Sequence, residues 1–232
     1  MPPWDPSMQS DKYPIAPVQQ AQVDDFEENR LMYYEALMGV DDSVGRVLDY
    51  LDDKGLAENT IVVYAGDNGF MWGEHGLIDK RYAYEESIRI PHLMRFPRMM
   101  PEGGRKVDEM VLNVDLAPTL LAAAGLAAPG DIQGLDCMKL ACGDSTGWRD
   151  SWLYEYFGDI GFPQPPCRAV CTREWKLIEY QKSYMQIRDF PDEMYHIATD
   201  PEEKHNLAQY PEFRDIRKKL QHEMKRLSKK YS

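Results

Sequence analysis

The chain has 232 residues, of which 43% are hydrophobic, so it is long enough to bury the core of one large domain or two small ones. Its formal net charge of -12 argues against a nucleic-acid partner, because clustered Lys and Arg supply most of the affinity for phosphates, and an anionic ligand would need a local basic pocket. No apolar run reaches the roughly 20 residues that cross a bilayer, and Met1 precedes Pro-Pro-Trp-Asp-Pro rather than a charged and then apolar leader, so we expect a soluble chain with no membrane partner and no signal peptide, in a compartment that stays unknown.

The first third of the chain has the pattern of an α/β domain. Five prolines in the first twenty residues predict an extended lead-in. Residues 24–51 place apolar side chains at a helical period, and Gly55 is placed to end that helix, which we expect to face the core. Residues 60–66 are β-branched and apolar almost throughout, which is typical of a strand covered on both faces in a parallel sheet. Asp67-Asn68-Gly69 follows at the carboxyl end of this strand, where open α/β sheets collect ligand-binding residues.

The next stretch predicts a second strand and a short helix. Residues 88–96 indicate a strand, and Pro91 places it at an edge or a bulge. Asp115 is placed to cap a helix over residues 116–124, which Gly125 would end. Residues 128–148 are rich in loop-forming residues.

Beyond residue 146 the pattern changes to short strands followed by one helix. The strands are expected near residues 151–157, 169–172 and 176–181. The terminal helix, 211–228, should pack on them through Ile216, Leu220, Met224 and Leu227, and its basic residues are interpreted as a solvated face rather than a polyanion-binding arm. Together these elements predict two domains: an α/β unit over residues 1–145 and a small antiparallel α+β unit over residues 146–232.

The four cysteines form two sequence pairs, Cys137 with Cys142 and Cys167 with Cys171. Neither pair has the two-residue gap of zinc knuckles, which argues against a metal cluster. Disulfides in an oxidising compartment and free buried thiols both account for these cysteines.

Residues 66–87 hold the highest density of groups that could carry chemistry. Asp67 and Asn68 offer hard oxygen donors that suit Ca²⁺ or Mg²⁺, although Asp-Asn-Gly is also an ordinary turn sequence. Lys80 could present an ammonium group to an anionic oxygen or could simply be solvated. His75 could be an acid, a ligand or a structural histidine.

Several segments occur in an order that is similar to that of a known enzyme family. They are residues 33–59 with Val-Asp-x-x-Val-Gly-Arg, the strand ending in Asp-Asn-Gly, Gly73-Glu-His-Gly76 with Lys80 and Tyr84-Glu-Glu-Ser-x-Arg-x-Pro91, Val114-Asp-Leu-Ala-Pro-Thr-Leu-Leu121, and residues 194–208 with Asp-Pro-Glu-Glu-Lys-His-Asn-Leu. In this order they resemble the type I sulfatases of the alkaline phosphatase superfamily, with His196 in place of the usual Asp.

The resemblance implies roles for six residues. Asp67 and Asn68 would be two ligands of the active-site Ca²⁺, with Mg²⁺ as the alternative cation, and Lys80 would be the catalytic residue that contacts the sulfate. The residues placed to line the substrate pocket are Glu74, His75 and Arg81. The family varies at these three positions, so a structural or gating role for His75 stays as open as a substrate contact.

The resemblance is to the C-terminal half of a sulfatase. Sulfatases use a Cys or Ser in Cys/Ser-x-Pro/Ala-x-Arg that is oxidised to formylglycine, and none of the four cysteines fits, since Cys171 stands in the arginine's place relative to Cys167. The upstream Asp pair and the lysine associated with the nucleophile are also missing, and Met1 stands where a sulfate-binding histidine would be. We therefore expect a truncated chain that has no turnover by itself and exposes apolar faces that favour self-association.

These expectations leave three functions. The first is a calcium-dependent hydrolase of sulfuric esters, acting on a sulfated small molecule or carbohydrate. The second is a non-catalytic truncated or binding product. The third is a phosphate or phosphonate monoester hydrolase of the same superfamily, because the same metal and lysine would serve a phosphoryl group.

Overall fold

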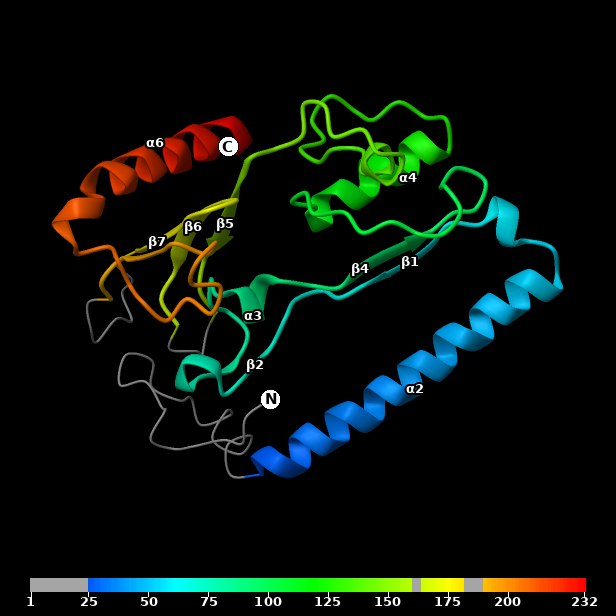
Figure 1. The fold of residues 1–232 in the computed structure, drawn as a ribbon, viewed down its shortest axis with the longest axis horizontal. Helices are drawn as coiled ribbons and strands as arrows, with labels where there is room; N and C mark the ends of the chain where they lie inside the picture. Colours follow the sequence, from blue (N-terminus) through cyan, green and yellow to red (C-terminus); the bar gives the residue numbers. More distant parts are fainter. Residues whose placement is uncertain (1–24, 160–163, 182–189) are drawn as a thin grey trace.

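The computed structural model describes residues 25–159, 164–181 and 190–232 (Figure 1). The predicted extended lead-in lies outside these residues, as does Met1, which the sequence analysis placed at the position of a sulfate-binding histidine. Within them, helices combine with antiparallel strands, which agrees with the expected α/β class. No helix in the described part of the chain has both the length and the apolar character to cross a bilayer.

The long predicted helix forms as α2 (Phe26–Asp53), but it does not face a core. Phe26 is its buried residue, and its ring meets Trp72 edge-on with centroids 6.0 Å apart. Leu31 and Met38 are 58% and 70% exposed, and Figure 1 shows α2 standing beside the β1–β4 ribbon. The helical period identified an apolar side correctly, but no described layer covers that side.

The predicted strand forms as β1 (Val62–Ala65), after the 3-10 turn η2 (Ala57–Asn59), and its pairing differs from the prediction. It pairs antiparallel with β4 (His92–Arg95), so that Tyr64 lies opposite Leu93 in a two-stranded sheet. β1 is half-buried to exposed rather than covered on both faces. An apolar run predicts a strand well, but it does not determine which strand will be its partner.

The strand predicted over residues 88–96 begins later in the structure. Ile88 instead ends a short helix, α3 (Glu85–Ile88), and Pro91 directly precedes β4. Proline before an edge strand costs no ladder hydrogen bond, which fits this position.

Asp115 precedes the predicted helix α4 (Leu116–Ala123), yet its side chain does not cap that helix. The carboxylate is fully buried and accepts hydrogen bonds from the backbone N–H groups of Leu112 and Leu135, each at 2.7 Å. Arg149 donates to both carboxylate oxygens at 2.5 Å. Asp115 therefore connects three parts of the chain: its own turn η4 (Asn113–Asp115), the loop at Leu135, and Arg149 just before the C-terminal sheet. The short helix α5 (Met138–Ala141) lies between the last two.

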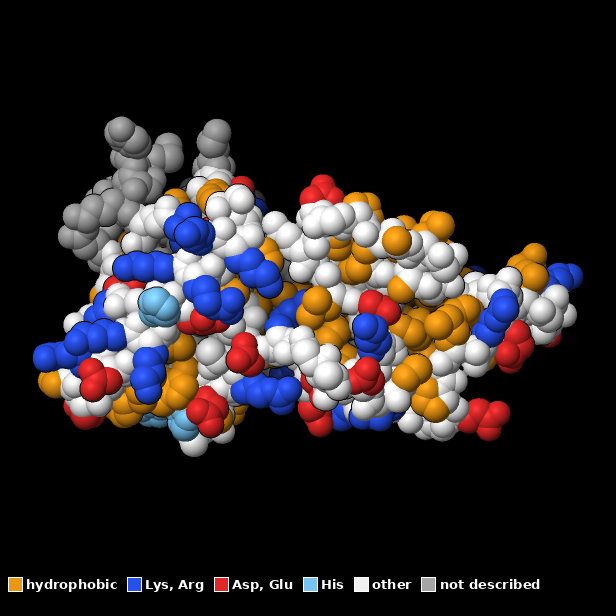
Figure 2. All heavy atoms as spheres, turned by 90° about the horizontal axis from the view of Figure 1, so that it is seen from above, with side chains coloured by type: hydrophobic (Ala, Val, Ile, Leu, Met, Phe, Trp, Pro, Cys, Tyr) orange, Lys and Arg blue, Asp and Glu red, His pale blue; other side chains and the backbone are white. Residues whose placement is uncertain are grey.

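The C-terminal part forms the predicted antiparallel sheet, closed by one helix. The strands follow the order β5 (Ser151–Tyr156), β6 (Cys167–Thr172), β7 (Lys176–Tyr180) and β8 (Glu193–Tyr195), of which the last was not predicted. After η5 (Pro211–Phe213), α6 (Arg214–Tyr231) packs on one face through Leu220, Met224 and Leu227, with Ile216 partly buried beside them, as predicted. Figure 2 shows basic side chains gathered at the end of the molecule that holds α6, as expected for a solvated helix face.

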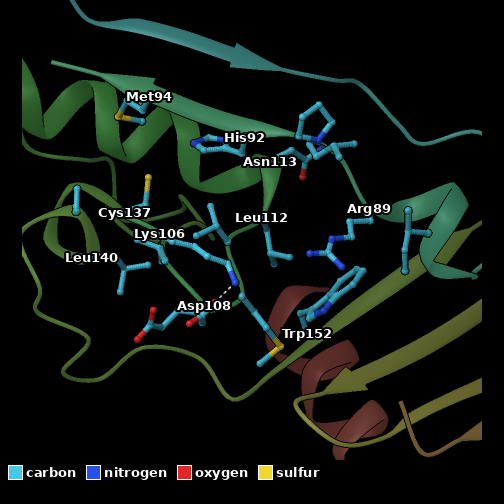
Figure 3. A pocket seen from close by; sticks show the side chains of 18 of the residues that line it. Arg89, His92, Met94, Lys106, Asp108, Leu112, Asn113, Cys137, Leu140 and Trp152 are labelled. Atoms are coloured by element: carbon cyan, nitrogen blue, oxygen red, sulfur yellow. Dashed lines mark ion pairs between the residues drawn. The ribbon is translucent and has the colours of Figure 1, made fainter. Parts of the chain in front are cut away.

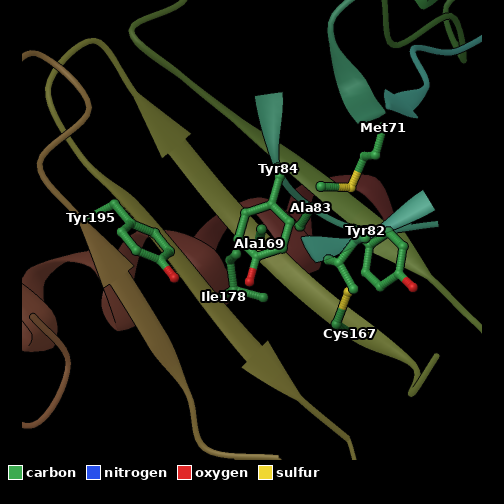
Figure 4. Packing of buried hydrophobic residues seen from close by; sticks show 9 residues of the cluster. Met71, Tyr82, Ala83, Tyr84, Cys167, Ala169, Ile178 and Tyr195 are labelled. Atoms are coloured by element: carbon green, nitrogen blue, oxygen red, sulfur yellow. The ribbon is translucent and has the colours of Figure 1, made fainter. Parts of the chain in front are cut away.

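The other face of this sheet is covered by residues from the first part of the chain. Figure 4 shows Met71, Tyr82, Ala83 and Tyr84 packed against a layer of strand residues that consists of Cys167, Ala169, Ile178 and Tyr195. The domain boundary near residue 146 stays a prediction, because this packing joins the two sides of it.

All four cysteines are free thiols in the structure. Cys137, Cys167 and Cys171 are buried, and burial raises the pKa of the Cys171 thiol to about 12. A buried thiol with a raised pKa is protonated and inert near neutral pH.

Candidate functional site

The turn after β1 is held tightly against α3. Gly69 donates its backbone N–H to the carbonyl of Ser87 at 2.9 Å. A Cβ atom at Gly69 would lie 2.0 Å from the carbonyl oxygen of Glu86, so only glycine allows this approach. The close packing fixes the position of Asp67 and Asn68 relative to the residues that follow Lys80.

Asp67 and Asn68 lie at the carboxyl end of β1, where the sequence placed them. Asp67 is exposed and accepts the backbone N–H of Asn68 at 2.9 Å. Asn68 is half-buried and donates its side-chain N–H to the carbonyl of Gly69 at 2.8 Å. This hydrogen bond uses the amide nitrogen and not the amide oxygen, which is the atom that could bind a cation. Both residues line a pocket of about 1930 Å³.

Lys80 lines the same pocket, directly after β3 (Ile78–Asp79), which pairs with β2 (Met71–Trp72). Its neighbours Asp79 and Arg81 both have positive φ angles, 103° and 98°. Residues other than glycine rarely adopt such backbone angles, because they cost energy. Residues that do adopt them cluster at functional sites. Among the described residues, the Lys80 ammonium makes no ion pair, so this cation is free to meet a ligand.

Arg81 also lines the pocket, but it already has two carboxylate partners. It donates to Asp79 at 2.6 Å and to Asp159 at 2.8 Å. Burial lowers the pKa of the guanidinium, but the hydrogen bond to Asp159 and the charge of Asp79 outweigh burial and raise it overall. Arg81 is therefore a cation held in place, and it contributes positive charge beside Lys80.

Glu74 and His75 are not among the residues that line the pocket that contains Lys80. They lie in the turn η3 (Glu74–Gly76), where Glu74 accepts the backbone N–H of Trp72 at 2.5 Å. The His75 ring stacks on Tyr84 with centroids 4.0 Å apart, and its Nε2 lies 3.8 Å from Glu86 Oε2. These contacts suit a structural role, and contact with substrate stays a prediction for both residues.

Glu86 is a pocket residue that the sequence analysis missed. Its Oε2 atom is buried and has no hydrogen-bond partner within the described part of the chain, and burial raises the pKa of this carboxyl. Both glutamates of Tyr-Glu-Glu-Ser line the pocket, and nothing in their spacing indicates that Oε2 of Glu86 is buried there.

The far wall of the pocket brings together segments distant in sequence (Figure 3). Arg89 and Trp152 line it from the segment before β4 and from β5, and Lys106 forms an ion pair with Asp108 at 3.0 Å. Both cations and carboxylates line the pocket, so its charge is mixed rather than basic. An anion must therefore be recognised by particular cations.

The oxygen donors of Asp67 and Asn68 fit a hard cation in chemistry but not in number. Ca²⁺ takes six to eight oxygen ligands. Across residues 25–159, 164–181 and 190–232, no group of three or more His, Cys, Asp or Glu side chains is arranged to hold a metal ion. This part of the chain could supply a fraction of such a site.

Two family models match the chain. The model described as "Sulfatase" matches residues 2–126, and the model described as "N-sulphoglucosamine sulphohydrolase, C-terminal" matches residues 73–230. The chain belongs to the sulfatase family. What it matches is the C-terminal portion of the type I sulfatase fold.

Curated sulfatases resemble the chain over most of its length. An N-acetylglucosamine-6-O-sulfatase of Bacteroides thetaiotaomicron is 34% identical over 206 residues, which are 86% of this chain and 35% of that protein. The N-acetylglucosamine-6-sulfatase of Bos taurus is 29% identical over 202 residues, which are 75% of this chain and 36% of that protein. The chain thus spans little more than a third of the length of these relatives.

Solved structures give the same result. One protein, solved in complex with its substrate D-glucosamine-2-N,6-O-disulfate, superposes with a TM-score of 0.76 at 34% identity, over 84% of this chain and 39% of that one. A phosphonate monoester hydrolase of Agrobacterium radiobacter superposes with a TM-score of 0.75 at 24% identity, over 88% of this chain and 42% of that one, which shows a shared fold.

Proposed function

We propose that this chain supplies the Lys80 side of the active site of a sulfatase that hydrolyses sulfuric esters of carbohydrates. The observation that carries the proposal is the placement of Lys80 at the pocket that Asp67 and Asn68 also line, between two residues with positive φ angles and with no ion pair among the described residues. The N-acetylglucosamine-6-O-sulfatase that the chain resembles, and the similar structure bound to D-glucosamine-2-N,6-O-disulfate, support a sulfated carbohydrate as the ligand.

The chemistry of this site is electrostatic. Negative charge builds on the ester oxygens as the bond to sulfur is cleaved, and a fixed ammonium stabilises that charge without having to reorganise. Lys80 would donate to a sulfate oxygen, and Arg81 would add positive charge beside it. Asp67 and Asn68 would provide oxygen ligands for Ca²⁺ or Mg²⁺, which when bound would polarise the sulfate.

The formylglycine route requires a nucleophile that the sequence does not contain in the family's motif. The side chains that bind an anion do not by themselves open a covalent route. The proposal is therefore that this polypeptide binds the sulfated end of the ligand without hydrolysing it.

The test is calorimetric titration of the full chain with N-acetylglucosamine 6-sulfate, beside Lys80→Ala and Lys218→Ala. Lys218 is an exposed lysine on α6, so its removal changes the net charge equally. We expect Lys80→Ala to weaken binding by about ten-fold or more, the usual value of one charged hydrogen bond, and Lys218→Ala to leave it unchanged. Equal affinity in all three proteins would refute the proposal.

A phosphate or phosphonate monoester hydrolase is the remaining alternative. The likeness to the phosphonate monoester hydrolase concerns the fold alone. Repeating the titration with N-acetylglucosamine 6-phosphate separates the two, because a phosphoryl site would bind that sugar more tightly than its sulfated counterpart.

A further inference from the structure

A fully buried lysine connects the C-terminal sheet to the segment that follows Lys80. Lys176, the first residue of β7, is 0% exposed. Its Nζ atom lies 2.7 Å from Glu85 Oε1 and 2.8 Å from Glu203 Oε1, and it donates a hydrogen bond to the carbonyl of Ala83 at 3.1 Å. A buried ammonium is tolerated only where such partners surround it.

The charge state of Lys176 follows from these neighbours. Burial lowers the pKa of the ammonium, but the carboxylates of Glu203 and Glu85 outweigh burial and raise it overall. Lys176 is therefore protonated, and it attracts Glu85 and Glu203 together.

Glu203 completes the connection from the other side. It is 1% exposed, and its Oε2 atom accepts the backbone N–H of Glu85 at 2.7 Å. The φ angle of Glu203 is 51°, in the left-handed region that residues other than glycine rarely adopt. Asp200 stabilises this turn by accepting the backbone N–H groups of Lys204 and His205 at 3.1 and 2.9 Å.

The segment held in this way starts at Lys80. The backbone N–H groups of Arg81 and Tyr82 both donate to Ser87 Oγ, at 3.2 and 3.3 Å, so residues 81–87 close on themselves. Lys176 holds this closed loop at Ala83 and Glu85. Two further residues of the loop, Tyr82 and Tyr84, pack on the C-terminal sheet (Figure 4). The loop can shift relative to the sheet only if the buried ion pairs break.

We infer that Lys176 and Glu203 are positioning residues, which hold residues 81–87 so that Lys80 presents its ammonium to the pocket. The inference rests on the proposed function, because it assigns to Lys80 the binding of an anion. Neither residue lines the pocket, so both act through the loop and not by contact with the ligand.

The test is a double-mutant cycle on binding of N-acetylglucosamine 6-sulfate, with Lys176→Met, Lys80→Ala and the double variant in the full chain. If Lys176 acts through Lys80, Lys176→Met weakens binding by about ten-fold and the double variant binds no more weakly than Lys80→Ala alone. A general loss of structure would instead weaken binding further in the double variant. Additive losses, or unchanged affinity in Lys176→Met, would overturn the inference.

Arg149→Met is the matched control, because it removes a cation from another buried ion pair, that with Asp115, outside the Lys80 pocket. It should lower stability while leaving the affinity of the folded protein unchanged. If Lys176→Met does not fold, Glu203→Gln takes its place in the cycle, since it keeps the shape and an acceptor for Glu85 while removing the charge. Non-additive losses in the Glu203→Gln and Lys80→Ala cycle then support the inference, and additive losses or unchanged affinity overturn it.

The two proposals fail separately. If Lys80→Ala binds as tightly as the unaltered chain, or the unaltered chain does not bind, the proposed function fails and the inference fails with it. If Lys80→Ala weakens binding but neither Lys176→Met nor Glu203→Gln does, the proposed function stands and the positioning role is wrong.

Discussion

Arg81 donates from Nη1 to Asp79 Oδ2 at 2.6 Å, and Lys80 lies between these two residues in the chain. Asp79 also accepts the backbone N–H of Lys80 itself, at 2.8 Å. The two bonds stabilise the positive φ angles on either side of Lys80, which would otherwise relax. The ion pair therefore fixes the backbone of the proposed sulfate-binding residue.

Replacing Asp79 with Ala should release this arrangement. The part-buried N–H of Lys80 would lose its acceptor and Arg81 would lose one of its carboxylate partners, so we expect a loss of about 1–3 kcal/mol in the free energy of unfolding. Urea denaturation measures it. Asp108→Ala, which breaks an exposed ion pair with Lys106, should leave the midpoint unchanged. Equal effects of the two changes would contradict this account.

Two glycines should respond to alanine in opposite directions. Gly69→Ala would place a Cβ atom 2.0 Å from the carbonyl oxygen of Glu86, so the turn after β1 must move and stability should fall. Gly39, inside the exposed helix α2, has nothing within 4 Å of that position, and Gly39→Ala should raise stability by about 0.5–1 kcal/mol. Thermal unfolding of both variants checks the signs, and stabilisation by Gly69→Ala would show that the turn is not tightly packed.

Glu223 should make stability sensitive to acid. Its carboxylate accepts hydrogen bonds from Arg226 and Ser151, which lower its pKa from 4.5 to about 2. A lowered folded-state pKa adds stability above pH 4.5 that is lost as the pH falls toward about 2. The carboxylate is half-buried at the surface, where solvent screens its ion pair with Arg226, so we expect less than about 1 kcal/mol. Glu223→Gln should flatten the fall in urea stability across this window, and Glu212→Gln should not. An identical fall in both variants would exclude Glu223 as the cause.

Exposed apolar side chains of α2 should promote self-association. Leu31, Met38 and Val47 are each more than half exposed on this helix, and Figure 2 shows further hydrophobic side chains gathered at the end of the molecule that holds α4. Sedimentation velocity should therefore detect oligomers, and the pair Met38→Gln with Val47→Gln should reduce them. Asp42→Asn, on the same helix, serves as control. A monomer at all concentrations would contradict the expectation.

Purified chain should show no sulfatase turnover on an aryl sulfate with calcium. Two oxygen ligands leave Ca²⁺ short of its usual six to eight, and no cysteine fits the formylglycine motif. The matched sample is the same chain extended upstream through a nucleophile motif, which we expect to be active. Calcium-dependent turnover by the unextended chain, abolished by Lys80→Ala, would show that a different nucleophile exists.

Local patterns predicted the elements of the fold better than their partners. The period of α6 identified Leu220, Met224 and Leu227 as its buried side, because the hydrophobic face of a helix is written in its own residues. The same reasoning found α2 and β1, yet it could not show that α2 is uncovered or that β1 pairs antiparallel with β4. Those facts depend on residues far away in the chain.

The site was predicted in the same uneven way. Family resemblance placed Asp67, Asn68 and Lys80, which the structure brings to one pocket. It did not reveal the positive φ angles of Asp79 and Arg81, because these follow from the contacts around them rather than from residue type. From sequence alone, a lysine at the start of a strand is predicted to be exposed to solvent. Only the structure shows that Lys176 is buried and ion-paired.

The most direct test of the proposed site is to map where a sulfated sugar binds, by following the backbone amide resonances of the labelled chain during titration with N-acetylglucosamine 6-sulfate. We predict that the largest shifts fall on Asn68, Lys80 and Arg81, and that they disappear in Lys80→Ala. Shifts confined to the basic face of α6, unchanged in Lys80→Ala, would contradict the assignment of this pocket as the sulfate site.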